Sequence, residues 1–203
     1  MSLKRKSLIF SLALLPLACF HAFAATGDDM NAGKIHFTGR LVEASCVIDG
    51  DSGTDINVPL GTYLTSQFAA TGDESEAMSF TIKLVGCPST SDGLSSVQLT
   101  FNGDTSLTGS ASLLNVSAIS TTVDEKQVDD TPAATGVGIA ISPEDQPDTL
   151  LKLDGSENQI YVATPEVSTD GVQTHFIARY KSFSDTVTAG PADADLTVNI
   201  LYR

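Results

Sequence analysis

The sequence has no tryptophan, few cysteines and few positive charges. Of its 203 residues, three are Cys and 11 are Lys or Arg, against 25 Asp and Glu, so the formal net charge is −14. A chain this acidic repels phosphate backbones and anionic lipid surfaces, which argues against nucleic-acid binding. The length suits one domain with a hydrophobic core rather than two.

Long apolar runs are also lacking. The longest, Ser7 to Phe20, has about 14 residues, whereas a membrane-spanning helix needs about 20. It follows three basic residues, 4–6, and precedes the small-x-small pattern Ala22-Phe23-Ala24. This arrangement is typical of a secretory signal peptide. We therefore expect residues 1–24 to be a signal peptide that is cleaved between Ala24 and Ala25, and the mature protein to be exported.

Loss of a signal peptide would leave 179 residues and two cysteines. Because three basic residues and no acidic ones leave with it, the formal net charge would fall to −17. The remaining cysteines, Cys46 and Cys87, would enter an oxidising compartment, where an even number predicts a disulfide. On the chain-entropy account, closing a loop of this size stabilises the fold by about 3 to 4 kcal/mol.

Helical periodicity is hard to find after residue 24. Short alternating or apolar runs bounded by Gly, Asp, Asn and Ser recur instead, which predicts an all-β sandwich. The polar segments 66–77 and 120–135 are expected to be long exposed loops. The predicted strands are Ile35–Val42, Ser45–Ile48, Ile56–Leu60, Met78–Val85, Val97–Phe101, Leu113–Val116, Val137–Ile141, Leu150–Leu153, Val172–Tyr180 and Leu196–Tyr202.

The residue patterns of enzymes and metal sites are missing too. No G-x-S-x-G elbow occurs, and the mature chain has two histidines, His36 and His175, each inside a strand pattern. Neither a catalytic triad nor a metal site can be assembled from these with any support. We expect no enzymatic activity, no metal and no cofactor.

The two ends of the mature chain carry the most informative patterns. From Lys34 onward the sequence alternates, which places Ile35, Phe37, Gly39 and Leu41 on one face of an extended segment. Taken alone, this pattern favours the first strand of a complete sandwich over a free arm. At the other end the apolar strand 196–202 finishes one residue before the sequence does, so one of its edges is expected to need a partner from elsewhere.

With these features the chain resembles the pilin subunits of chaperone–usher fimbriae, in particular the major subunits of type 1-like fimbriae. The resemblance runs through nearly all of the mature sequence. It rests on four features: the segment Gly33–Gly39 before the first cysteine, the cysteine spacing, the run Phe176–Tyr180, and the ending. The ending combines a Gly fourteenth from the C-terminus, Gly190, with the penultimate Tyr202.

The resemblance implies an immunoglobulin-like sandwich that lacks its C-terminal strand and is completed by donor-strand complementation. A periplasmic chaperone first lends a strand, and at the outer-membrane usher the N-terminal extension of another subunit replaces it. Residues 25–43 would be this extension, and residues 44–203 the pilin domain. The implied donor residues are Ile35, Phe37, Gly39 and Leu41, and the implied acceptor-groove and chaperone-contact residues are Gly190, Val198, Ile200, Tyr202 and Arg203.

The expected function is structural: a subunit that polymerises head to tail, with identical or related pilins, into a cell-surface fimbria used in adhesion. The alternative is a minor or tip-proximal pilin whose own surface binds a ligand. A two-domain tip adhesin would need an additional lectin domain, for which 179 residues leave no room. The rival class is a self-sufficient exported sandwich, which predicts a stable monomer.

Overall fold

The computed structural model describes residues 34–39, 41, 43, 45–90, 93–117, 132–167 and 171–202. The chain divides into two units, residues 1–38 and 39–203, and every described strand belongs to the second. Within these described ranges, no helix is long and apolar enough to cross a membrane. The predicted cleavage site between Ala24 and Ala25 and the terminal Arg203 lie outside the described residues.

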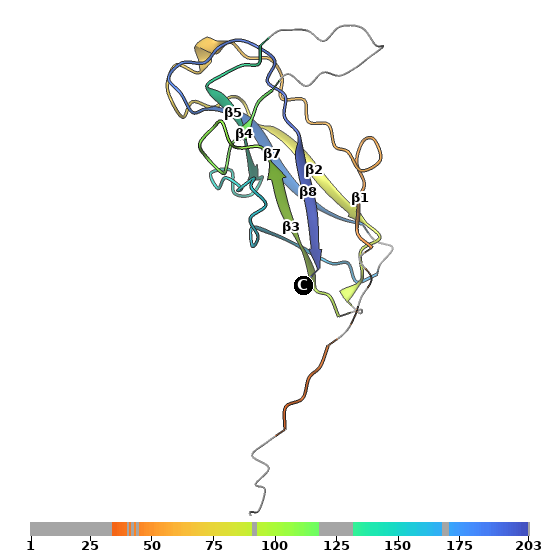
Figure 1. The fold of residues 1–203 in the computed structure, drawn as a ribbon. Helices are drawn as coiled ribbons and strands as arrows, with labels where there is room; N and C mark the ends of the chain where they lie inside the picture. Colours follow the sequence, from red (N-terminus) through yellow and green to blue (C-terminus); the bar gives the residue numbers. More distant parts are fainter. Residues whose placement is uncertain are drawn as a thin grey trace, which may run out of the picture. The chain divides into compact units, whose positions relative to one another are not determined.

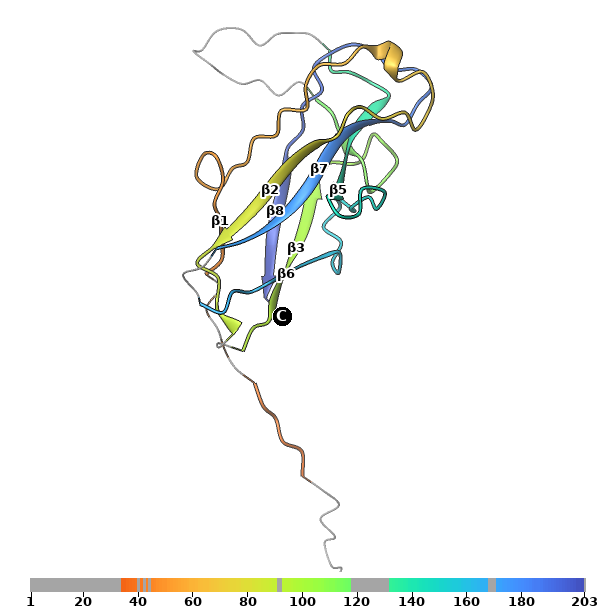
Figure 2. The same ribbon diagram turned by 180° about the vertical axis from the view of Figure 1, so that it is seen from behind.

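Two antiparallel sheets pack face to face, which confirms the predicted all-β class (Figures 1 and 2). The one helical element that lies wholly within the described residues is the 3-10 turn η1 (Thr65–Gln67). The five-stranded sheet has the order β1 (Val47–Ile48), β2 (Met78–Val85), β7 (Val172–Ser182), β5 (Val137–Pro143) and β4 (Leu114–Asn115). The three-stranded sheet has the order β6 (Ile160–Ala163), β3 (Ser96–Gly103) and β8 (Leu196–Tyr202).

Alternating apolar residues build the core between the sheets. In β3, Val97, Leu99 and Phe101 are fully buried. The Phe101 ring meets Phe176 of β7 edge to face, with ring centroids 5.5 Å apart, so this pair joins the two layers. Because burying one such side chain stabilises a fold by roughly 1.5 to 3 kcal/mol, this alternation decides which face of each strand turns inward.

One predicted strand is absent and one observed strand was not predicted, and in both cases pairing with a distant segment decides the outcome. Residues 150–153 form no strand, although Leu151 and Leu153 are buried. Their backbone N–H groups bond to carbonyls of two different segments, at Ile141 and at Ala111, so no continuous ladder forms. Conversely, β6 was not predicted, because it has four residues and gains strand structure by pairing with β3.

The segment 56–60 keeps the predicted alternation without becoming a strand. Ile56 and Val58 are half-buried and Leu60 is buried, while Asn57 and Pro59 between them are exposed. The described residues of the predicted strand 35–42 are likewise not in a ladder. An alternating segment forms a strand only where a neighbouring strand lies within hydrogen-bonding distance.

The polar segment 66–77 is mostly exposed, as predicted, but part of it is attached to the sheet. Phe68 is buried, and residues 70–76 run against β7 and the residues after it. The backbone N–H of Gly72 donates to Ser182 and that of Ser75 to Tyr180, each at 3.0 Å. In the other predicted loop, 120–135, the described residues include the buried Ala134; residues up to 131 lie outside the description.

A buried arginine anchors this segment to the sheet. The Arg179 Nε lies 2.5 Å from Glu74 Oε2, and its other nitrogens donate to Ser142 Oγ at 3.1 Å and to the Pro147 carbonyl at 3.0 Å. Lys181 Nζ contacts the second Glu74 oxygen at 2.5 Å. Burial acts to raise the Glu74 pKa, but the hydrogen bonds and charges of Lys181 and Arg179 outweigh it, so the pKa is lowered.

Replacing Glu74 by glutamine should lower the free energy of unfolding at pH 7 by about 2 kcal/mol, because Arg179 loses its charged acceptor while it stays buried. A lowered folded-state pKa stabilises the chain above the ordinary carboxyl range, and this contribution is lost as the pH falls below about 4.5. Urea unfolding at pH 7 and about pH 3 should therefore show the two chains converging in acid. The exposed Glu76→Gln is the control, and an equal deficit at both pH values would contradict the assignment.

Candidate functional site

A groove of about 1730 Å³ runs beside β8. One wall is the inner face of β8, where four residues alternate with more exposed ones. All four are partly buried and pack against the core: Leu196, Val198, Ile200 and Tyr202. The sequence prediction named three of them, Val198, Ile200 and Tyr202, as groove residues, and the structure places all three in its lining.

The opposite wall is formed by residues 46–48 and the segment 54–62, and the floor comes from the five-stranded sheet. Ile56, Val58 and Leu60 turn toward the groove side. The alternation in this segment therefore lines the groove, although the segment forms no β-ladder. The floor residues are Phe80 and Ile82 of β2 and Ile139 and Ile141 of β5. On each of these three sides the groove thus has apolar side chains of the kind that fill the inside of a sandwich.

Each wall lies where a sheet ends. In the described part of the chain, β8 is paired with β3 on one side and forms the edge of its sheet, and β1 is the edge of the other sheet. An edge strand presents backbone N–H and C=O groups that can pair with a further strand. A strand at 56–60 would need its neighbour in the space that the groove occupies, which explains why that segment has no ladder.

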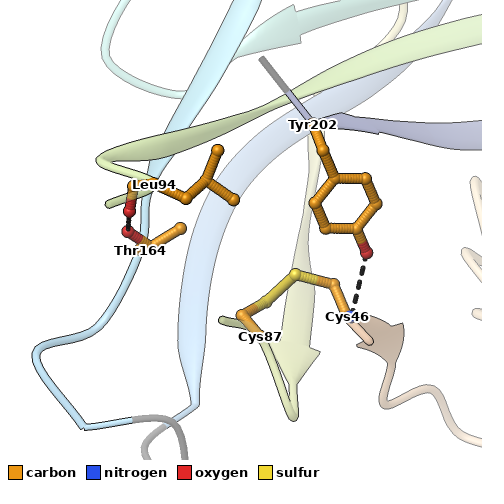
Figure 3. The surroundings of a disulfide bond; sticks show 5 residues. All are labelled: Cys46, Cys87, Leu94, Thr164 and Tyr202. Carbon is orange, nitrogen blue, oxygen red and sulfur yellow. Dashed lines mark hydrogen bonds between the residues drawn. A yellow bond between two sulfur atoms is a disulfide. The ribbon is translucent and has the colours of Figure 1, made fainter. Parts of the chain in front are cut away.

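A disulfide and a tyrosine tie the two walls together at one end of the groove. Cys46, which precedes β1, is bonded to Cys87, just after β2, as predicted. The backbone N–H of Cys46 donates to the Tyr202 hydroxyl at 2.9 Å (Figure 3). On the other side of the disulfide, Thr164 donates to the Leu94 carbonyl. Tyr202 was predicted from its penultimate position, but its bond to the opposite wall is seen only in the structure.

A second tyrosine lies farther along the groove. Tyr180 lines it, donates its hydroxyl to the Ala192 carbonyl at 3.0 Å, and meets Tyr63 edge to face at 6.0 Å. Burial raises the pKa of Tyr180, and the charge of Asp193 adds to this, so the hydroxyl stays a donor. The sequence analysis assigned Tyr180 no role in the groove.

Gly190 is not among the residues that line the groove. It lies against the backbone of residues 132–134, where an added Cβ would come within 2.3 Å of the Pro132 carbonyl oxygen. The adjacent Pro191 carbonyl accepts from the Ala134 N–H at 2.8 Å. The absence of a side chain therefore permits two backbones to meet just before β8 begins.

The implied donor residues present an apolar stripe to solvent. Ile35, Phe37 and Leu41 are 81%, 91% and 100% exposed, and apart from its two chain neighbours no residue comes within 4 Å of the position that a Cβ on Gly39 would take. Large apolar side chains at alternating positions are seldom left in water without a partner. Both the groove and this stripe are thus apolar surfaces of the kind that association buries.

The described residues hold no group of three or more His, Cys, Asp or Glu that could bind a metal ion. The groove offers apolar surface and strand edges, the features to which a further strand can add. A sandwich with an open edge of this kind defines the class of pilin-like subunits.

The chain belongs to the fimbrial protein family, whose model matches residues 35–203. It is 33% identical over 198 residues to a probable major fimbrial subunit, LpfA, of Escherichia coli O157:H7, covering 98% of this chain and 97% of that one. It is also 35% identical over 192 residues to the type-1 fimbrial protein subunit of Serratia marcescens, covering 94% and 98%.

Comparison of structures agrees with this assignment. The fold is similar to a subunit in the structure of a chaperone–usher pilus, with 25% identity and a TM-score of 0.55, covering 86% of this chain and 97% of that one. The sandwich is therefore immunoglobulin-like. The protein is a structural subunit of a cell-surface fimbria, with related pilin subunits as partners, and not an enzyme.

Proposed function

We propose that this subunit polymerises by donor-strand exchange, in which the extension 25–43 of one copy fills the groove in the pilin domain, 44–203, of another. The observation that carries the proposal is the match between two apolar surfaces. The exposed stripe of Ile35, Phe37 and Leu41 has the alternation of a strand with one buried face, and the groove is apolar and open beside an edge strand.

The inserted strand would run antiparallel to β8. All described strand pairs are antiparallel, so this orientation continues the existing sheet. At about 3.3 Å per residue, the eight residues 34–41 span roughly 26 Å, which matches the seven-residue β8. Gly39, with no side chain, lets the two backbones approach closely within that length.

Such a joint would be strong and would propagate. Three large side chains, each contributing roughly 1.5 to 3 kcal/mol on burial, are added to a ladder of main-chain hydrogen bonds. The extension and the groove are different surfaces of one chain, so the contact is head to tail and does not close on itself. Repetition therefore produces an open filament.

Before assembly the open groove would invite aggregation, because it combines apolar surface with a free strand edge. This supports the route that the resemblance implies. The signal peptide, residues 1–24, directs the chain to the periplasm, a periplasmic chaperone lends a strand and holds the end of β8 at Tyr202 and Arg203, and the outer-membrane usher exchanges that strand for the extension of another subunit.

Within the fimbria we assign the chain to the main fibre, as a structural subunit that supports adhesion. Relatives described as a probable major fimbrial subunit and as a type-1 fimbrial protein subunit support this assignment over a minor or tip-proximal adaptor. The abundance of this chain in purified fibres decides between the two.

The proposal is tested on the full mature chain carrying Phe37→Arg, whose own extension cannot fill a groove. A synthetic peptide of residues 30–42 should bind this chain and raise its midpoint of thermal unfolding by more than about 10 °C, because a ligand that binds only the folded state stabilises it. The same peptide with Phe37→Arg is the control. If the chain is stable and its midpoint does not respond to the wild-type peptide, the sandwich is complete and the mechanism is wrong.

A further inference from the structure

The donor segment, residues 30–42 of the extension, is basic in an otherwise acidic protein. Residues 30–42 contain Lys34, His36 and Arg40 and no Asp or Glu, while the whole chain has a formal net charge of −14. These basic residues alternate with the apolar stripe, so in an inserted strand they face away from the groove floor. Lys34 and His36 are exposed; Arg40 lies outside the described residues and enters through its sequence position alone.

The groove has the opposite charge. Among the described residues that line it, every charged side chain is acidic: Asp55, Glu157, Asp193 and Asp195. Asp193 and Asp195 are exposed and alternate with Ala192 and Ala194, which are half-buried against the core just before β8. These two carboxylates therefore stand on the outer side of the same rim along which an inserted strand would lie.

We propose that Asp193 and Asp195 recognise the outward-facing basic side chains of a second copy's extension and determine the direction in which it inserts. The inference rests on donor-strand exchange, and it names the charged surface that selects the strand. Its occupant is residues 30–42 of another copy, because that segment combines the apolar stripe with charge opposite to the rim.

The direction of insertion follows from the position of the two aspartates, just before β8 begins. In an antiparallel strand Arg40 comes to the beginning of β8, near Asp195, while Lys34 comes to its end. If Phe37 lies opposite Val198, Arg40 lies opposite Asp195; if Phe37 lies opposite Ile200, Arg40 lies opposite Thr197, two residues from Asp195. A parallel strand would bring Lys34, not Arg40, to these carboxylates.

We expect these charges to change the association rate of the donor segment more than its affinity. Ion pairs between exposed side chains change affinity little, since water and salt screen them. Complementary charge instead steers the encounter, and raises association rates about tenfold or more at low salt. The interaction of Asp193 and Asp195 with the donor segment should therefore appear as a salt dependence of the association rate.

The first experiment measures how fast a fluorescent peptide of residues 30–42 binds the full mature chain carrying Phe37→Arg. Between about 20 and about 300 mM NaCl the rate should fall roughly tenfold. Adding Asp193→Asn and Asp195→Asn should reduce this fall to about twofold or less. Asp145→Asn with Asp148→Asn, two exposed acids outside the groove lining, is the matched control. An unchanged salt dependence in the rim variant overturns the proposal.

The second experiment exchanges charges. A peptide with Arg40→Glu should bind about tenfold more slowly at low salt, and Asp195→Arg in the acceptor should restore its rate. A peptide with Lys34→Glu should gain little from Asp195→Arg. If Asp195→Arg rescues the Lys34→Glu peptide instead, the strand inserts in the parallel direction and the assigned partner is wrong.

The two proposals fail in different ways. If the control peptide with Phe37→Arg binds as well as the wild-type peptide, the apolar stripe does not enter the groove and donor-strand exchange itself fails. If Phe37 is required but every chain shows the same salt dependence, the groove function stands and the charge inference is overturned.

Discussion

Replacing Phe37 by arginine should abolish filament assembly. The substitution places a charge where a 91% exposed ring would be buried on insertion, and burying an unpaired guanidinium costs more than the other apolar contacts return. The full chain is expressed together with its chaperone and usher, and surface fibres are counted by electron microscopy. We expect fewer than about one hundredth of the wild-type fibres, because the substituted residue recurs at every joint.

Thr38→Arg is the matched control, since it introduces the same side chain one position along, where the strand faces outward. It should leave assembly near the wild-type level. A second pair tests the groove: Ile200→Arg should stop assembly and the outward-facing Asn199→Arg should not. If the inward and outward substitutions behave alike, the alternating geometry of the joint is contradicted.

Removing the disulfide should have the second large effect. The double substitution Cys46→Ser and Cys87→Ser is expected to lower the free energy of unfolding by about 3 to 4 kcal/mol, because the open chain gains entropy when unfolded. It should also loosen one groove wall, since Cys46 is the residue whose N–H binds Tyr202. Urea unfolding of the chain with peptide 30–42 bound, in wild-type and double-variant form, measures both effects.

Tyr202→Phe separates the two contributions. It removes the hydroxyl that accepts from Cys46 and keeps the ring and the disulfide, so it should cost about 1 kcal/mol. If it destabilises the chain as much as the cysteine substitutions do, the hydrogen bond rather than the covalent link anchors the wall. If neither change alters stability, the anchoring role of this corner is wrong.

The alternation of apolar residues was sufficient to predict the long central strands. In β2, β3, β7 and β8 most inward positions carry an apolar residue that packs against the core, so local pattern and tertiary burial agree. It was not sufficient at 150–153 or at 160–163, because hydrogen bonds to distant segments decided those two cases. Periodicity reports which side chains become buried and leaves open whether a neighbour exists to pair with the backbone.

The functional site, too, could be predicted only where its residues form a local pattern. The apolar residues of β8 and the donor stripe could be predicted because they repeat every second residue, and Tyr202 because of its place near the end. The alternation at 56–60 was recognised from the sequence, but its role as a groove wall was not. Nothing in the local sequence shows that this segment has no partner strand. The anchor formed by Glu74 and Arg179 was also missed, since its two residues lie 105 positions apart.

By itself, the sequence determined an exported, acidic, all-β chain with one disulfide pair and an alternating apolar segment at each end, because composition and period are local properties. Only the tertiary structure decided that β8 ends a sheet, that the segment 54–62 faces it across an open groove, and that the charged residues along that groove are acidic. These are relations between segments far apart in the chain, and they exist only once the two sheets have packed together.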